Sequence, residues 1–244
     1  MARKTRFDLR IEPHQVDFTL RATLPSLLSS ILNAAGLDAH MKGFGTDAIQ
    51  QGNRSWVLSR MAVEIDRRPE QYAGYALETW ISDYGRLLST RNFTLTDEAG
   101  DCFGRCVTQW AMIDLDTRSA VDLSWVGREH ADAVVAEEPP AERPRKIRAV
   151  EPGFTVTHPV VYSDIDFNRH VNTIRYVEMM VDALPVEWPT QERPVRIDIH
   201  FLKESRYGQT LAVGCQLCEE TRTALFEIAA DGAPASVRAS FCWK

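Results

Sequence analysis

The sequence predicts an α+β protein of two similar halves, each with an antiparallel sheet wrapped around one central helix. Strand-like runs follow one another without intervening helices, which disfavours a parallel α/β fold because parallel strands need long crossovers. The order strand, helix, four strands occurs twice in the 244 residues, which indicates two similar domains rather than a solenoid. The second helix is apolar over most of its circumference and must therefore be enclosed on several sides.

A proline-rich, charged segment separates the two halves. Residues 135–152 (VAEEPPAERPRKIRAVEP) lack apolar periodicity and are typical of a linker or a surface excursion. The sequence therefore predicts an N-terminal domain over residues 1–134, a linker over 135–152 and a C-terminal domain over 153–244.

In the first half, a strand near residues 16–20 is expected to lead into a helix over residues 23–40. Leucines and Ile31 recur there at helical spacing. Four strand-like runs follow, and a turn that contains Asp and Gly joins the last two. These runs are residues 56–65, 75–84, 87–95 and 104–115.

In the second half, β-branched residues predict a strand over 153–162, and a helix is expected to begin near Asn168. Its polar stripe is narrow, with Arg175, Glu178 and Asp182. An antiparallel sheet curled around such a helix is the hotdog pattern, so the chain is predicted to be a tandem double hotdog. The remaining expected strands are residues 193–202, 209–217, 223–230 and 236–243.

Composition and short sequence patterns argue against several classes of function. The formal net charge of -6 makes nucleic acid an improbable partner, because phosphate binding needs a basic surface. No segment approaches the roughly 20 apolar residues of a spanning helix, so membrane insertion is not expected. No secretory signal is visible, and a cytoplasmic location is expected. The CQLC sequence, residues 215–218, lies in a predicted strand without a second ligand pair, so free thiols are favoured over a metal or redox site.

Three reactive polar side chains alternate where the second helix is expected to begin. They are Asp166, Asn168 and His170, and Asn172 follows them. Helix capping explains one such residue but not four, so the pattern favours catalysis. With Asn168 as N-cap, the free amides near residues 169–171 would face the site and could stabilise an oxyanion.

This motif resembles that of the acyl-ACP thioesterase family. FLKESRYGQTL, which contains Glu204, is similar to the family's second catalytic segment, and LLSTRNFTLTDEAG and TQWAMIDLDTR in the first half are also similar. The resemblance implies hydrolysis of fatty acyl-acyl carrier protein to free fatty acid and carrier, without a metal or other cofactor. It implies Asp166, Asn168, His170 and Glu204 as catalytic residues and acyl carrier protein as partner. The sequence leaves the oligomeric state open, with a homodimer as the candidate because hotdog units often pair.

Water is the expected nucleophile. Ser205 stands where plant members of the family carry a cysteine, so a mechanism that depends on that thiol is impossible here. A Ser205–His170–Asp166 triad ranks lower, because no nucleophile-elbow glycines surround the serine. Either Glu204 or Asp166 could be the general base. Glu204 is favoured, with Asp166 organising Asn168 and His170.

Glu204 can reach the predicted site only if the strand before it departs from regular alternation. Strand alternation places it on the face opposite Ile197 and Ile199, so it reaches a helix-facing site only if the strand bulges or ends before it.

The first half lacks the polar triplet and is expected to supply scaffold and space for the acyl chain. The residues expected to bind substrate are Asn172, Leu28, Ile31, Trp56 and Met61. Two alternatives stay open for the function: an acyl-CoA thioesterase, and a non-catalytic acyl-binding protein. The basic run at residues 143–148 is interpreted as solvated linker charge rather than a dock for an acidic carrier.

Overall fold

The computed structural model describes residues 3–244 and contains ten strands and five α-helices. Within residues 3–244, no helix is both long enough and apolar enough to cross a membrane. The strands of the first half are β1 (Thr5–Arg10), β2 (Arg54–Ile65), β3 (Gly74–Tyr84), β4 (Ser89–Asp97) and β5 (Cys102–Asp114). Those of the second half are β6 (Phe154–Pro159), β7 (Val195–Phe201), β8 (Thr210–Cys218), β9 (Thr223–Ala230) and β10 (Ala235–Trp243). The helices are α1 (Leu24–Met41), α2 (Thr46–Gln50), α3 (Ser124–Glu129), α4 (Thr173–Asp182) and α5 (Glu187–Thr190), with single 3-10 turns η1 (Pro13–Gln15), η2 (Ala131–Ala133) and η3 (Tyr162–Asp164).

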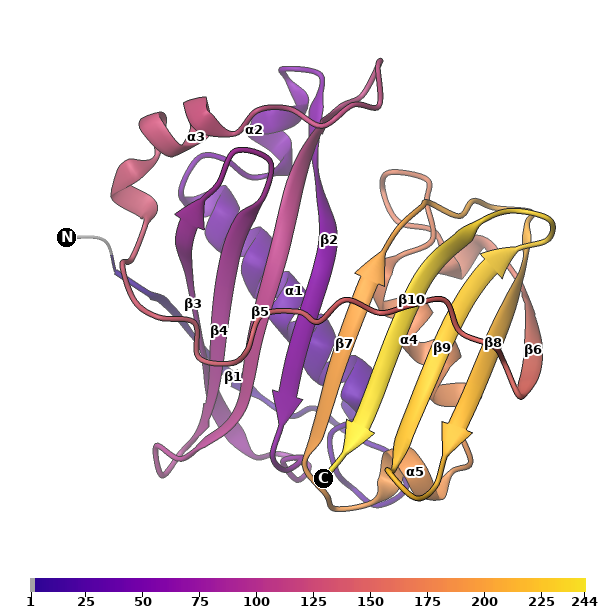
Figure 1. Cartoon of the computed structure of the whole chain (residues 1–244). Helices are drawn as coiled ribbons and strands as arrows, with labels where there is room; N and C mark the ends of the chain where they lie inside the picture. Colours follow the sequence, from indigo (N-terminus) through magenta and orange to yellow (C-terminus); the bar gives the residue numbers. More distant parts are fainter. Residues whose placement is uncertain (1–2) are drawn as a thin grey trace.

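All ten strands form one antiparallel sheet in the order β1-β3-β4-β5-β2-β7-β10-β9-β8-β6 (Figure 1). The second half repeats the strand order of the first in mirror image, and the halves meet edge to edge where β2 pairs with β7. The predicted α+β class and the hotdog arrangement of antiparallel strands around a helix in each half are confirmed. The two sheets expected from the sequence are, however, continuous with one another.

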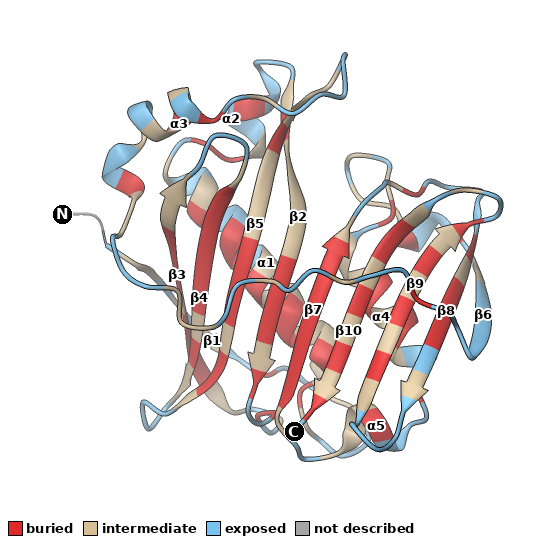
Figure 2. Ribbon diagram, in the orientation of Figure 1, coloured by how far each residue is buried: buried red, intermediate tan, exposed pale blue. Residues whose placement is uncertain are grey.

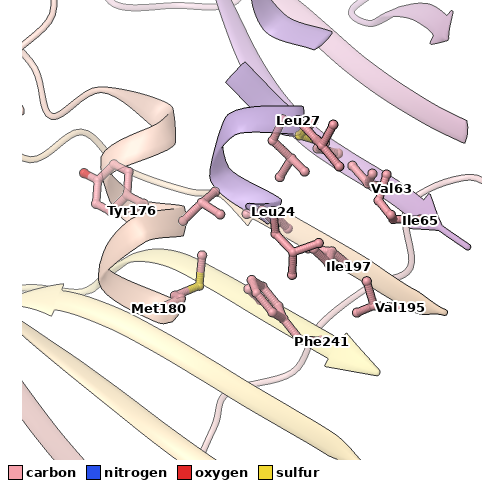
Figure 3. Close-up of a cluster of buried hydrophobic side chains, with 14 of the residues drawn as sticks. Leu24, Leu27, Val63, Ile65, Tyr176, Met180, Val195, Ile197 and Phe241 are labelled. Atoms are coloured by element: carbon pink, nitrogen blue, oxygen red, sulfur yellow. The ribbon is translucent and has the colours of Figure 1, made fainter. Parts of the chain in front are cut away.

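One hydrophobic core serves both halves, because α1 and α4 pack against the same face of the continuous sheet. Figure 3 shows this core at the junction, and Figure 2 shows that β7 is buried along nearly its whole length and β2 toward its C-terminal end. The labelled side chains come from both helices and from β2, β7 and β10: Leu24, Leu27, Val63, Ile65, Tyr176, Met180, Val195, Ile197 and Phe241. The halves therefore share buried apolar surface in addition to the β2–β7 ladder.

The segment 135–152 crosses the opposite face of the sheet without forming a helix or strand (Figure 1). It covers the outward-facing residues of β7, which are consequently buried. Arg196 donates to Glu64 on β2 at 2.7 Å, to Asp198 at 2.8 Å and to the carbonyl of Arg143 at 3.2 Å. The segment is thus fastened to the junction of the halves through a buried, fully paired arginine.

Two expected elements begin elsewhere. The first strand is β1, at Thr5–Arg10, and residues 16–20 form a loop. The helix expected to begin near Asn168 begins at Thr173, and its N-cap is Asn172, whose Oδ1 accepts the amide of Ile174 at 2.8 Å. The physical reason is the loop before it, in which Arg169 adopts a φ of 63°, a conformation that a helix does not contain.

The loops before α1 and α4 are two copies of one backbone structure. Asp17 and Asp166 each accept, through Oδ1, the amide of the residue two positions later at 2.8 Å. Leu20 and Arg169, three positions after each aspartate, both have positive φ, 59° and 63°. Each loop then ends at the N-cap of its helix. The first half therefore keeps the loop although it lacks the Asp-Asn-His triplet.

The first-half copy of the loop has a positively charged side chain where the second-half copy has the carboxylate of Glu204. Isolated backbone β-bridges pair Arg21 with Glu70 in the first half and His170 with Arg206 in the second. Arg68 lies two positions before Glu70, as Glu204 lies two positions before Arg206, so Arg68 occupies the position that corresponds to Glu204. The Arg68 side chain is buried, and it donates to Asp17 Oδ2 at 2.5 Å and to the carbonyl of Thr190 in the second half at 2.9 Å. This copy of the loop therefore holds the two halves together.

Replacing Arg68 with Met is expected to lower the free energy of unfolding by about 3 kcal/mol, because it leaves Asp17 half-buried without its cation. Urea unfolding measures this. Arg67→Met is the matched control, since Arg67 pairs with Asp97 at the surface and its loss should cost less than about 1 kcal/mol. Equal losses in the two variants would contradict the assignment.

Candidate active site

The site is formed where the loop before α4 meets the segment that follows β7. His170 Nε2 lies 3.0 Å from Glu204 Oε2. Because β7 ends at Phe201, Glu204 lies beyond the strand and is not bound by its alternation. The second condition foreseen for Glu204, a strand that ends before it, is the one the structure meets.

Asp166 holds the loop through its backbone. Its Oδ1 accepts the amides of Asn168 at 2.8 Å and of His170 at 3.1 Å, and its own amide donates to the carbonyl of His170 at 2.8 Å. These three contacts close a tight turn that presents the side chains of Asn168 and His170 to the same cavity.

The amides expected to bind an oxyanion are already occupied. The amide of Arg169 donates to the carbonyl of Asp166 at 3.0 Å, and that of Val171 to the carbonyl of Ser205 at 2.8 Å. The amide of His170 is held by Asp166. The prediction of free amides at residues 169–171 is therefore wrong, because the helix begins later and its first amide belongs to Thr173, which lines the cavity.

Asp164 is a buried carboxylate beside the site, in the loop before α4, that the sequence interpretation missed. It is fully buried, its Oδ2 accepts from His158 Nε2 at 2.8 Å and its Oδ1 accepts from Arg175 Nε at 2.9 Å. Burial raises the pKa of its carboxyl, but hydrogen bonds from Val161, His158 and Arg175 outweigh burial and leave that pKa below its ordinary value. The signal was present, because Asp164 continues the alternation of Asp166, Asn168 and His170 by one step.

The first half contributes a cation to the site. Arg118, in the turn after β5, forms an ion pair with Glu204 Oε1, and Arg206 Nη2 lies 3.9 Å from Oε2. Glu204 therefore lies between one imidazole and two guanidinium groups. Arg118 was not foreseen, although it ends the segment TQWAMIDLDTR on which the resemblance partly rested.

A cavity of about 1040 Å³ opens beside these residues and is lined by both halves. The polar groups at one end include Asp166, Asn168, His170, Asn172 and Glu204. Its apolar members include Leu32, Trp56, Leu58, Trp110, Ile174 and Phe201. This volume suits a small molecule or a flexible chain, since ligand pockets commonly measure several hundred cubic ångströms.

The residues expected to bind substrate divide into two groups. Asn172 and Trp56 line the cavity. Leu28, Ile31 and Met61 are fully buried in the core and are not among the described residues that line it, which corrects that expectation. The physical reason is helical spacing: the cavity-lining face of α1 carries Ser29, Leu32, Asn33 and Gly36, and the neighbouring face packs into the core.

Comparisons with known proteins agree over the whole length. The family models "Acyl-ACP thioesterase N-terminal domain" and "Acyl-ACP thioesterase C-terminal domain" match residues 2–125 and 148–244. The structure of an acyl-ACP thioesterase from Bacteroides thetaiotaomicron is 34% identical, with a TM-score of 0.89 over 99% of this chain and 98% of that one. A 12:0-ACP thioesterase from Umbellularia californica, 18% identical, has the same fold, with a TM-score of 0.89 over 99% of this chain and 97% of that one.

A plant relative is longer than this chain. The chloroplastic oleoyl-acyl carrier protein thioesterase 1 of Arabidopsis thaliana is 26% identical in an alignment 197 residues long that covers 72% of this chain and 54% of that protein. The chain thus spans little more than half the length of the plant relative. With both family models matched in order and a bacterial homologue aligned from end to end, the chain belongs to the acyl-ACP thioesterase family.

Proposed function

We propose that this protein hydrolyses the thioester of fatty acyl-acyl carrier protein, giving free fatty acid and the carrier thiol, by attack of water. One observation carries the proposal: the His170–Glu204 pair, 3.0 Å apart, stands beside a cavity of about 1040 Å³ that both halves line. A thioester at this point would have its acyl chain in the cavity and its reacting carbon beside a carboxylate.

Glu204 acts as the general base in this proposal. Water held by its carboxylate loses a proton as it attacks the thioester carbon, and the proton then serves the departing thiolate. A positioned base typically contributes about 10²–10⁴-fold to the rate. His170, beside Glu204, orients the carboxylate or the water, and the Asp166 turn fixes His170.

The developing oxyanion needs hydrogen-bond donors. Within the described part of the chain the amides of residues 168–172 already donate to protein oxygens, which leaves the first amide of α4 at Thr173 and the side chain of Asn168. Thr173 stands at the positive end of the α4 dipole. Removing one donor of this kind typically raises a barrier by about 3 kcal/mol.

Water is favoured over Ser205 as the nucleophile. Ser205 is 1% exposed, and its Oγ lies 2.8 Å from Ser236 Oγ rather than in hydrogen-bond contact with His170. A hydroxyl buried in that way offers no attack path to a substrate in the cavity.

The domain division predicted from the sequence remains part of the proposal. Residues 153–244 would carry out catalysis, residues 135–152 would link the halves, and residues 1–134 would supply the acyl space. Arg118 extends the last role, because it brings a first-half cation to Glu204.

A thiol-release assay tests the proposal. Purified protein is given acyl-acyl carrier proteins of increasing chain length, and Asp166→Asn is run beside it. Release by the wild type, reduced in the variant, is expected. The absence of thiol release from every acyl-carrier substrate would overturn the proposal and leave the acyl-CoA thioesterase and the non-catalytic acyl-binding protein as the alternatives.

The acyl-CoA alternative is separated by kcat/KM. The same acyl chain is presented on carrier protein and on coenzyme A, and a higher value is expected on the carrier. A cytoplasmic location and a homodimer stay predictions, and sedimentation equilibrium tests the second.

The rate is expected to fall at acid pH as His170 becomes protonated. Burial lowers the pKa of its imidazole below 6.5, and Arg206 and Arg118 lower it further against the opposing effect of Glu204 and Asp166. His170 is then neutral at pH 7, and its protonation would hold Glu204 as an ion pair and weaken it as a base. A plot of kcat/KM against pH should show an acid limb centred below 6.5 that His170→Asn removes and His14→Asn, at an exposed site, does not. A limb centred above 6.5 contradicts this assignment.

A further inference from the structure

The residues that β4 contributes to the cavity are polar, and they lie beside Ile81 and Tyr84 of β3. Along the helix-facing side of β4, Leu95 and Phe93 are buried in the core, but the next two residues on that side are Arg91 and Ser89, which line the cavity. Tyr84, paired with Ser89 across the hairpin, lines it as well. An acyl chain that reached this part would therefore meet polar groups where β4 could have continued with apolar ones.

The Arg91 side chain is fixed at this position and has more N–H donors than it uses. Its side chain is 5% exposed, and Nη1 donates both to Asp38, on α1, and to Thr79 Oγ1 at 3.3 Å. A guanidinium carries five N–H donors, and within residues 3–244 these two contacts are the hydrogen bonds its side chain donates. The guanidinium is fixed by its carboxylate and still has capacity for another acceptor.

The Tyr84 hydroxyl is buried and has no hydrogen-bond partner in the described part of the chain. Its ring packs edge-on against Phe44, with centroids 6.4 Å apart, so the side chain is held in place. Burial raises the pKa of this phenol far above its usual value, which keeps the hydroxyl a donor. Leaving such a group unpaired typically costs about 1–3 kcal/mol, a cost that an incoming oxygen would relieve.

This polar group is separated from the catalytic residues. β4 lies three strands from β7 in the sheet, a spacing of roughly 14 Å at about 4.8 Å per strand. It therefore cannot bind the thioester itself and would meet a part of the chain well beyond the reacting carbon.

We propose that Ser89, Arg91 and Tyr84 form a distal subsite that selects acyl chains carrying an oxygen, as a hydroxyl or oxo group, near their far end. The inference rests on the proposed thioesterase function and adds a substrate class to it. A plain methyl end leaves the donors unpaired, whereas an oxygen at the same point accepts from them. Plain chains are accordingly hydrolysed best when they stop short of the subsite.

The wild-type protein tests this directly. Acyl-carrier substrates are prepared as pairs of equal length, one plain and one with a hydroxyl on the terminal or penultimate carbon, over a series of lengths. At the length that reaches the subsite, kcat/KM is expected to favour the hydroxylated chain by about tenfold. A ratio below about threefold at every length overturns the inference, and hydrolysis of short plain chains in the same series shows separately whether the thioesterase function holds.

Two variants assign the effect to the subsite. Tyr84→Phe removes one donor without changing shape and should lower the ratio by about threefold to tenfold while short plain chains are hydrolysed as before. Tyr75→Phe is the control, because Tyr75 lies buried on the same strand and is not among the residues that line the cavity. Equal ratios in the wild type and Tyr84→Phe overturn the role given to the tyrosine.

Discussion

Replacing Glu204 with Gln is expected to lower kcat/KM for acyl-carrier hydrolysis by about 10²–10⁴-fold, the usual contribution of a general base. Gln keeps the size of the side chain and its capacity to bond His170, 3.0 Å away, but it cannot take a proton from water. The loss should fall on kcat rather than KM, because proton transfer takes place in the transition state and not in substrate binding. Steady-state kinetics on one acyl-carrier substrate measures both constants.

Glu178→Gln is the matched control. Glu178 lies on α4, pairs with Arg175, and is exposed to a similar degree, 35% against 30% for Glu204, but it is not among the residues lining the cavity. Its replacement should leave kcat/KM within about twofold. If Glu204→Gln keeps most of the activity while Asp166→Asn loses it, the base is Asp166, which was the other candidate from the sequence.

The sequence predicted the fold because its signals are local. Alternation and β-branched residues marked the strands β2 to β10, and the apolar surface over most of α4 required enclosure. The first strand was misplaced at residues 16–20, since VDFTL has strand composition but is held as a turn by Asp17. The local pattern also did not show that β2 pairs with β7 and so joins the two sheets. Which edge strands pair is decided by how the two halves pack together, and this is not visible in the pattern of one strand.

The sequence pattern alone predicted only the part of the site that lies in one continuous segment. Asp166, Asn168 and His170 are close in sequence, and their meeting with Glu204 came from the resemblance. Arg118 lies 86 positions from Glu204, and no periodicity connects two such positions. The helix start was misjudged because Asn168 and Asn172 are equally good caps by residue type, and the positive φ of Arg169 decides between them.

The two copies of the loop show how one backbone serves two purposes. Asp17 and Asp166 form the same turn, so the turn itself is not catalytic. What differs is the side chain facing it: Arg68 closes the first copy with a buried ion pair, and Glu204 leaves the second with a carboxylate beside a cavity. A charge reversal at one position is thus enough to separate a structural contact from a candidate catalytic one.

Replacing Asp38 with Asn is expected to lower the free energy of unfolding at neutral pH by about 3 kcal/mol, the cost of removing one partner of a buried ion pair. The Asp38 side chain is fully buried in contact with Arg91, Lys42 and Thr5. Asparagine keeps the shape but leaves two cations facing a neutral amide. Urea unfolding near pH 7 measures the loss, and Asp8→Asn, at an exposed pair with Arg6, should change stability by less than about 1 kcal/mol.

The same substitution has a pH signature with a definite sign. Burial raises the pKa of the Asp38 carboxyl, but Arg91, Lys42 and Thr5 outweigh burial and hold that pKa below 3.8 in the folded protein. A depressed folded-state pKa contributes stability that is present above the unfolded-state value, about 3.9, and is lost as the pH falls through the folded-state value. The gap in unfolding free energy between the wild type and Asp38→Asn should therefore be constant from pH 7 to about 5 and narrow below about 4. A gap that widens on acidification would mean that the folded protein holds Asp38 protonated, with Arg91 at the cavity then lacking its counter-charge.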